Sequence, residues 1–177
     1  MKKLYISLLV GFISVLSHAQ TTYYANSSTG NDSNFGLSPS SAKRSFTAAY
    51  NAASGGDTIA LSGTFDWTDA QETGDAAITG FSLLKPLTIV GDGAGLTFIQ
   101  SAPTPGTADR CVFTIDHDIT LEHLTIRHGF NTNQGENAGG ITVMDQIRDN
   151  IVTLNNCIIE NNEIDNGVTT NYNFAGG

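Results

Sequence analysis

Apolar residues recur along this chain in short runs, most of them three to five residues long and bounded by Gly, Asn or Asp. Within several runs apolar and polar residues alternate, which is typical of strands that bury one face. The expected strands cover residues 22–25, 57–62, 87–90, 97–99, 111–115, 119–121, 124–126, 141–144, 151–154 and 157–159.

A repeat with a period near 33 residues links three of these runs. Thr88, Thr120 and Thr153 each stand between two apolar residues and follow one another at spacings of 32 and 33 residues. Residues 119–126 and 152–159 share a longer pattern of apolar-Thr-Leu, two polar residues and apolar-x-Ile. The two polar residues predict a sharp bend between two strands. In each triplet the two apolar residues that flank the Thr are expected to point into the interior, and the Thr side chain is expected to point toward solvent.

This repeat predicts an all-β fold, a right-handed parallel β-helix in which each coil is one repeat and equivalent strands stack along the axis. Ankyrin and tetratricopeptide repeats have a similar length but need two helices per unit, and propeller blades need longer strands and a longer period. Residues 138–140 (Ala-Gly-Gly) recur as residues 175–177, so the chain is expected to stop inside a repeat after three coils or fewer. The expected core columns are Ile89, Leu121 and Leu154, and Ile126 with Ile159. The residues expected at bends, where they can bond turn backbone or form ladders, are Asn155, Asn156, Asn161 and Asn162.

One helix is expected before the coils. Apolar residues in the segment 42–53 recur at spacings of three and four, Ser41 can cap its start, and Gly55 and Gly56 can end it. A β-helix needs a cap, because its first coil otherwise exposes strand edges and apolar interior. Residues 20–56 are therefore predicted to form an N-terminal cap and residues 57–177 the coils; packing of the helix on the side of the solenoid is the alternative.

The first nineteen residues have the features of a secretory signal peptide. Lys2 and Lys3 precede a mostly apolar run at residues 4–16, and small residues precede the expected cleavage site between Ala19 and Gln20. An uncleaved N-terminal anchor is the alternative. The expected location of the mature chain is secreted or at the cell surface, with outer-membrane association.

The charge narrows the range of partners. The chain has 8 Lys and Arg against 17 Asp and Glu, a formal charge of −9, and loss of Lys2 and Lys3 with the leader brings it to −11. Phosphate binding needs clustered cations, so nucleic acid and anionic membrane surfaces are not expected partners. No later stretch has the roughly 18 consecutive apolar residues of a membrane span, so no membrane insertion is expected.

Two parts of the chain resemble known families. Residues 22–36, the following helix and residues 56–59 look like the N-terminal cap of secreted pectin-lyase-like β-helix proteins. Residues 119–140 and 151–177 are similar to polymorphic outer-membrane-protein repeats, which combine a strand, an Asn-rich bend and a Gly-Gly pair. The Phe-x-x-Asn signature of those repeats is altered, because Ile158 stands where they have Phe before Asn161.

The resemblance implies two functional classes. Polymorphic outer-membrane proteins are surface adhesins, whereas pectin-lyase-like enzymes cleave acidic polysaccharides. Because the fold alone does not choose between them, the choice depends on the residues. We expect a non-catalytic role in adhesion or carbohydrate contact, with extracellular polysaccharide or a host or neighbouring cell surface as partner. The alternative is a polysaccharide lyase or hydrolase whose catalytic residues lie beyond residue 177, and a purely structural spacer is a third hypothesis.

The acidic residues offer candidate Ca²⁺ sites, and the catalytic residues, if there are any, are unknown. Asp116 and Asp118 flank His117, and together with Arg127 they could form a Ca²⁺ and proton-abstraction site of the pectate-lyase type. Asp32, in an Asn-Asp-Ser-Asn segment, has oxygen ligands suited to a structural Ca²⁺. A solvated turn is the favoured interpretation of the Asp116–Asp118 segment. No other cofactor is expected.

The remaining candidates favour plain structural roles. The polar stretch 66–80, which contains Asp66, Asp69 and Asp75, is expected to be a solvated surface loop. Residues 91–95 (Gly-Asp-Gly-Ala-Gly) are expected to form a turn, because the helix that a phosphate loop requires is missing. The histidines at 117, 123 and 128 match no metal-ligand spacing. The cysteines, Cys111 and Cys157, are expected to be small core residues, and a bridge between coils is the alternative.

Overall fold

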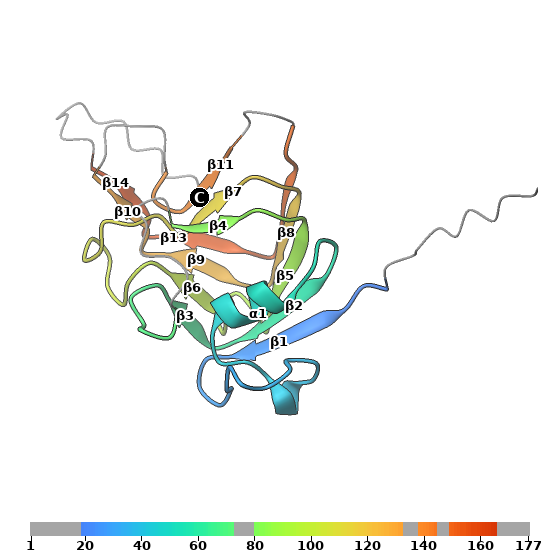
Figure 1. Ribbon diagram of the computed structural model, residues 1–177. Coiled ribbons are helices and arrows are strands. Elements are labelled where there is room, and N and C mark those ends of the chain that lie inside the picture. Colours follow the sequence, from blue (N-terminus) through green and yellow to red (C-terminus); the bar gives the residue numbers. More distant parts are fainter. Residues whose placement is uncertain (1–18, 73–79, 133–137, 145–148, 166–177) are drawn as a thin grey trace, which may run out of the picture.

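The computed structural model describes residues 19–72, 80–132, 138–144 and 149–165. In this part of the chain short parallel strands stack into a β-helix, the fold class predicted from the sequence (Figure 1). The predicted signal peptide lies outside the described residues, except for Ala19, and so does the second Ala-Gly-Gly triplet. No helix among the described residues is long and apolar enough to cross a membrane.

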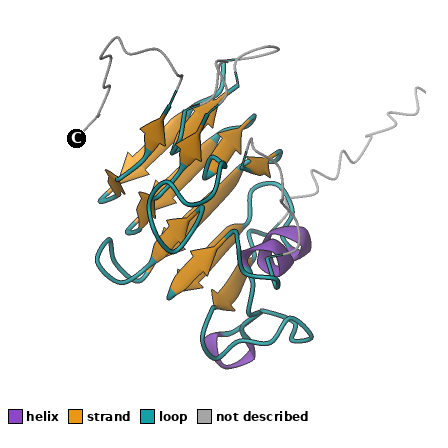
Figure 2. Ribbon diagram, turned by 90° about the vertical axis from the view of Figure 1, so that its left-hand side faces the viewer, coloured by secondary structure: helices purple, strands orange, loops and turns teal. Residues whose placement is uncertain are grey.

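Successive coils contribute strands to three sheets, A, B and C, and these strands lie side by side along the axis (Figure 2). The later coils also form a short fourth sheet, D. Sheet A contains β1 (Thr22–Asn26), β2 (Thr58–Ser62), β5 (Leu87–Gly91), β8 (Ile119–Glu122) and β12 (Val152–Asn155). Sheet B contains β3 (Thr64–Asp66), β6 (Phe98–Gln100), β9 (Thr125–Arg127) and β13 (Ile158–Glu160). Sheet C contains β4 (Phe81–Leu83), β7 (Phe113–Ile115) and β11 (Ile141–Val143), and sheet D contains β10 (Phe130–Asn131) and β14 (Glu163–Ile164). The four steps from β1 to β12 exceed the three coils expected from the sequence.

The predicted core columns are confirmed by the strand register. Ile89 pairs with Leu121, and Leu121 pairs with Leu154 in the next coil. Ile126 pairs with Ile159 in sheet B. Ile89, Leu121 and Ile126 are fully buried, whereas Leu154, in the last described coil, stacks in register but is 43% exposed. The predicted core burial therefore holds as far as β8 and β9, and Ile159 is partly buried.

Residues with positive φ make the bends on either side of sheet B. His123 and Asn156 occupy equivalent bends before β9 and β13, with φ of 55° and 51°. His128 and Asn161 occupy the bends after these strands, with φ of 62° and 52°. Asn and His tolerate this left-handed conformation better than most residues do. Asn156 and Asn161 therefore lie at bends as predicted, whereas Asn155 is the last residue of β12, where its Nδ2 donates to Glu122 Oε1 at 2.8 Å. Asn162 adds a tie between coils, because its Nδ2 donates to the Ile126 carbonyl and its Oδ1 accepts from the Gly129 N–H.

The helix is shorter than predicted and starts later. It is α1 (Phe46–Ala52), and its N-cap is Ser45, whose side chain accepts from the Ala48 N–H; Ser41 instead ends a short 3₁₀ helix, η1 (Pro39–Ser41). Phe46 is fully buried and lies edge-on to Phe81 of β4, with 4.8 Å between ring centroids. In the later coils a strand of sheet C comes directly before each strand of sheet A. In the first coil α1 takes that position, directly before β2. It therefore closes the interior of the first coil rather than packing on its outer side.

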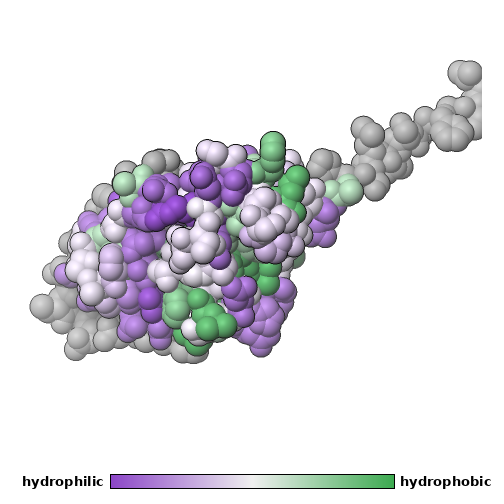
Figure 3. Space-filling model, turned by 90° about the horizontal axis from the view of Figure 1, so that it is seen from below, coloured by the Kyte–Doolittle hydropathy of each residue, from purple (hydrophilic) through white to green (hydrophobic). Residues whose placement is uncertain are grey.

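The cap also covers the edge of β1. The Tyr24 N–H donates to the Gly36 carbonyl at 2.7 Å, and the Lys43 N–H donates to the Tyr24 carbonyl at 2.9 Å. The Asn26 N–H donates to the Lys43 carbonyl at 2.8 Å. The edge of the first strand is therefore paired, which removes a template for association with other chains. Seen from this end, the surface is mostly hydrophilic or neutral, with separate hydrophobic spots (Figure 3).

Both cysteines are free thiols. Cys111 is fully buried, and Cys157 is partly buried, with its Sγ 3.3 Å from the Leu121 carbonyl oxygen. Burial raises the pKa of the Cys111 thiol to about 11. The prediction of core cysteines therefore holds for Cys111 and in part for Cys157, and the alternative of a bridge does not.

Candidate functional site

The outer face of sheet A carries a column of five threonines. Thr22, Thr58, Thr88, Thr120 and Thr153 occupy the same register position in the five strands. Neighbouring strands are about 4.8 Å apart, so their hydroxyl and methyl groups repeat at that interval along the axis. The sequence predicted the last three members, and the structure adds Thr22 and Thr58.

A shallow hollow of about 290 Å³ runs beside this column. Its floor includes Thr88, Thr120 and Thr153, which come from three successive coils. Pro86 and Asp118, just before β5 and β8, lie along its rim together with Ile151, just before β12. The hollow therefore presents hydroxyls on its floor and alternating apolar and acidic groups on its rim, all held by the strand ladder.

A second, smaller hollow of about 200 Å³ lies toward the other end of the strands on the same sheet. Tyr24, Asn26 and Ser62 line it from β1 and β2, and Asp92, from the turn after β5, joins them. Ala60, a small residue next to Tyr24 in the ladder, also lines this hollow. This part of the face combines an aromatic ring, an amide, a hydroxyl and a carboxylate, the groups that commonly contact sugars.

The Asp116–Asp118 segment forms the turn between β7 and β8, as the favoured interpretation had it. Asp118 Oδ1 accepts from the Ile151 N–H at 2.9 Å, and Asp116 Oδ1 accepts from the Asn150 side chain at 3.4 Å. Arg127 lies at the end of β9 in another sheet, where its Nε donates to Gln100 Oε1 at 2.9 Å. The aspartates thus tie two coils together, and Arg127 bonds to a different partner.

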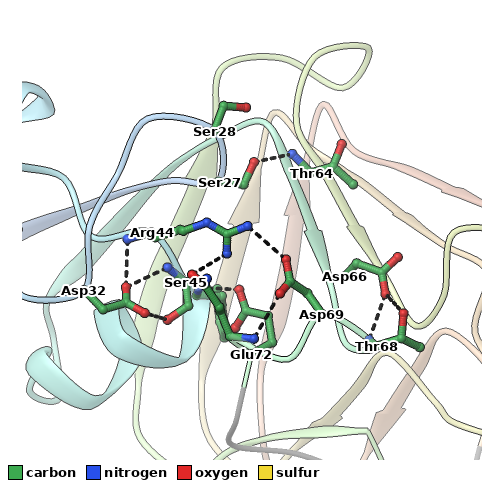
Figure 4. Close-up of polar contacts among 12 residues, drawn as sticks. Ser27, Ser28, Asp32, Arg44, Ser45, Thr64, Asp66, Thr68, Asp69 and Glu72 are labelled. Atoms are coloured by element: carbon green, nitrogen blue, oxygen red, sulfur yellow. Dashed lines mark hydrogen bonds and ion pairs between the residues drawn. The ribbon is translucent and has the colours of Figure 1, made fainter.

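Asp32 is engaged with the residues that start α1 (Figure 4). Its Oδ1 accepts from the N–H groups of Arg44 and Ser45 at 2.7 and 2.8 Å, and its Oδ2 accepts from the Ser45 hydroxyl at 2.8 Å. Both carboxylate oxygens therefore serve the turn that enters the helix. Binding of Ca²⁺ at Asp32 would compete with these bonds, and it stays a prediction, as does binding at Asp116 and Asp118.

A buried carboxylate, Glu72, holds the first turn of α1. It accepts from the N–H groups of Phe46 and Thr47 at 2.8 and 3.0 Å and from the Thr47 hydroxyl at 2.9 Å. Burial raises the pKa of Glu72, the three hydrogen bonds act in the opposite direction, and the charge of Asp32 adds slightly to the rise. Negative charge at this position also complements the positive end of the helix dipole.

The expectation that the stretch 66–80 is a solvated loop is wrong for its first part. Trp67 is buried, and its Nε1 donates to the Val112 carbonyl at 2.8 Å. Asp69 forms an ion pair with Arg44 at 3.2 Å. A backbone hydrogen bond from Gln71, followed by the contact with Arg44, lowers the pKa of Asp69. Asp75 lies outside the described residues.

Two further candidates have structural roles. Residues 91–95 end β5 and form a turn, as expected, and a Cβ on Gly91 would stand 2.5 Å from the His123 carbonyl oxygen. Gly91 is therefore required by the close approach of the next coil. His123 and His128 are bend residues, and the described part of the chain brings no three His, Cys, Asp or Glu side chains together as a metal site.

Sheet B carries a polar column of its own. Gln100 Nε2 donates to Asp66 Oδ2 at 2.7 Å, and Arg127 bonds to Gln100 in turn. The Arg127 guanidinium also lies over the Phe98 ring, 4.0 Å from its centroid, which fixes the charge against the sheet. Glu160 of β13 is the register partner of Arg127 in β9. Sequence reasoning missed this column because its members differ in type from coil to coil.

Comparison of the chain with protein-family models, with curated proteins and with solved structures gave no match.

Proposed function

We propose that this chain is an exported, non-catalytic β-helix protein that contacts extracellular polysaccharide or a neighbouring cell surface through the outer face of sheet A. The observation that carries the proposal is the register of five threonines beside a hollow that spans three coils. A repeating polymer presents the same groups at regular intervals, and a ladder of identical side chains can meet several of them at once. The leader-like N-terminus and the resemblance to pectin-lyase-like and outer-membrane repeats support an extracellular location.

The architecture suits binding, because the contact groups are already ordered. Four of the five Thr side chains stand on strands that are hydrogen-bonded on both sides, β1 through the cap, and Thr153 stands on β12, the last described strand of sheet A. Little conformational entropy is therefore lost when a ligand binds, so weak contacts can sum to a useful affinity. Each Thr offers a hydroxyl for hydrogen bonds and a methyl group for the apolar faces of sugar rings.

The test is a polysaccharide-binding assay with matched threonine variants. Wild type should be retarded in native gels that contain one or more of a panel of plant, microbial and algal polysaccharides. Thr88→Val and Thr120→Val remove hydroxyls from the hollow while keeping the strand preference, and should weaken that retardation. Thr64→Val, on the outer face of sheet B, is the control and should behave as wild type. Absence of binding across the panel, or equal loss in all three variants, would refute the proposal.

The alternative, a polysaccharide lyase or hydrolase, rests on the resemblance of the fold. It predicts release of unsaturated or reducing ends from polyuronates on incubation with the protein, with and without Ca²⁺. The same polysaccharide panel measures this activity directly, and turnover that Thr120→Val leaves unchanged would favour the alternative over binding by sheet A.

A further inference from the structure

The charges around the two hollows of sheet A indicate which polymers they accept. Asp118 is the charged residue on the rim of the larger hollow, and Asp92 is the charged residue of the smaller one. Among the described residues that line either hollow there is no Lys or Arg. A polyuronate carries a carboxylate on each sugar. In either hollow these carboxylates would meet negative potential, with no cation to pair with.

The nearby cations are already committed elsewhere. Lys85 precedes Pro86 in the chain, but its Nζ donates to the carbonyls of Tyr50 and Ala53 at 2.6 Å each and lies over the Tyr50 ring. Lys43, in the cap beside β1, donates through its Nζ to the carbonyls of Asp32 and Asn34. Moving either cation to a ligand would leave backbone carbonyls without these donors. The acceptors and donors that remain for a ligand on this face are hydroxyls, amides and carboxylates.

We infer that the outer face of sheet A selects neutral, hydroxyl-rich polysaccharides and rejects polyuronates, with the polymer following the axis of the β-helix along the Thr88, Thr120 and Thr153 floor. The inference rests on the proposed binding role of the same face and specifies its ligand class. Sugar hydroxyls can donate to the Asp118 carboxylate and exchange hydrogen bonds with the threonine hydroxyls, while the exposed Ile151 and Pro86 side chains contact the apolar faces of the rings.

The direction along the axis follows from the composition of the hollow. Its floor and rim each draw equivalent positions from coils that stack at intervals of about 4.8 Å. A chain lying across the strands can therefore use the same contact in each coil. A chain lying parallel to the strands would meet one threonine of the column and then Val90 or Glu122, the next outward residues of β5 and β8.

The decisive experiment compares a neutral β-glucan with polygalacturonate, using the whole protein and isothermal titration. Each polymer is tested in EDTA and again in millimolar Ca²⁺, because Ca²⁺ could bridge uronates to Asp118 and Asp92. We expect the glucan to bind at least tenfold more tightly than polygalacturonate in both buffers. Thr120→Val should weaken glucan binding about threefold to tenfold, the effect of one hydrogen bond, and Thr64→Val should leave it unchanged.

A charge-reversal variant tests the cause of the preference. Ile151 is 66% exposed on the rim, and only its backbone N–H bonds to Asp118, so Ile151→Lys adds a cation without removing that bond. It should gain affinity for polygalacturonate, and the gain should fall as salt is added. Ile151→Gln is the neutral control, and thermal melting checks that both variants fold.

The outcomes separate the two proposals. Polygalacturonate binding as tight as glucan binding, in either buffer, overturns the selectivity inference and leaves the binding role of sheet A in place. Absence of binding to either polymer and to the rest of the panel overturns the proposed function and the selectivity with it. Glucan binding that Thr64→Val reduces as much as Thr120→Val overturns the assignment to sheet A.

Discussion

Replacing Glu72 with Ala should destabilise the cap, because three donors depend on its carboxylate. The side chain is 7% exposed and accepts two backbone N–H groups and one hydroxyl at the start of α1. Leaving buried donors unpaired costs about 1–3 kcal/mol per site, and loss of the charge at the helix N-terminus adds up to about 1 kcal/mol. Relief of the desolvation of the carboxylate offsets part of this. We therefore expect a net loss of about 2–4 kcal/mol in the free energy of unfolding.

The assay is thermal and urea unfolding followed by circular dichroism. For a chain of this size the expected loss corresponds to a fall of about 4–16 °C in melting temperature. Gln71→Ala is the matched control, because Gln71 is exposed and its contact with Arg44 lies at the surface, where such bonds contribute little. If Glu72→Ala and Gln71→Ala lowered the free energy of unfolding equally, within about 0.5 kcal/mol, Glu72 would not hold the helix as we describe.

Three further predictions concern the core and its titrating groups. Under native conditions at pH 8 a maleimide should label Cys157 and leave Cys111 unmodified, because Cys111 is fully buried and its thiol pKa is about 11; mass spectrometry detects this, and rapid labelling of Cys111 would contradict its burial. Leu121→Ala should cost about 2–5 kcal/mol in urea unfolding, whereas Leu154→Ala, at a site 43% exposed, should cost less than about 1.5 kcal/mol; equal costs would mean that another segment buries Leu154. Burial raises the pKa of Glu72 above 4.5, so the part of the stability that is linked to this pKa shift is fully present below pH 4.5 and is lost as the pH rises through the folded-state pKa. Over that window the stability of wild type should fall relative to Glu72→Gln, and parallel pH profiles would exclude the raised pKa.

The part of the fold that follows the repeat could be predicted from the sequence, because there each coil carries the same local signal. The triplets around Thr88, Thr120 and Thr153 placed three strands of sheet A and their stacked neighbours correctly. Thr22 and Thr58 escaped the same reasoning, because the cap insertion and a shorter coil change the spacing to 36 and 30 residues. The threonine column could therefore be predicted in part.

Long-range contacts set the features that the sequence did not reveal. Ser41 and Ser45 are both reasonable helix caps, and the choice falls to Ser45, which Asp32 holds from thirteen residues earlier. Trp67 stands in a polar stretch of the sequence, but its ring packs against the rings of Phe46 and Phe113 in the core. The centroid of its ring lies 5.5 Å from that of Phe46 and 5.8 Å from that of Phe113. No local pattern encodes either contact.

The paired edge of β1 gives the solenoid a direction of growth. A chain synthesised from its N-terminus completes the Gly36 and Lys43 contacts before the later coils exist, so the first strand to pair has one edge closed and one open. Each following coil can then add to a finished surface in a single register, since the threonine and core columns of the coil before it supply the template. We therefore expect the cap to be the starting point of vectorial folding, and damage to it to lower the yield of folded protein more than an equal loss of stability in the last coil does.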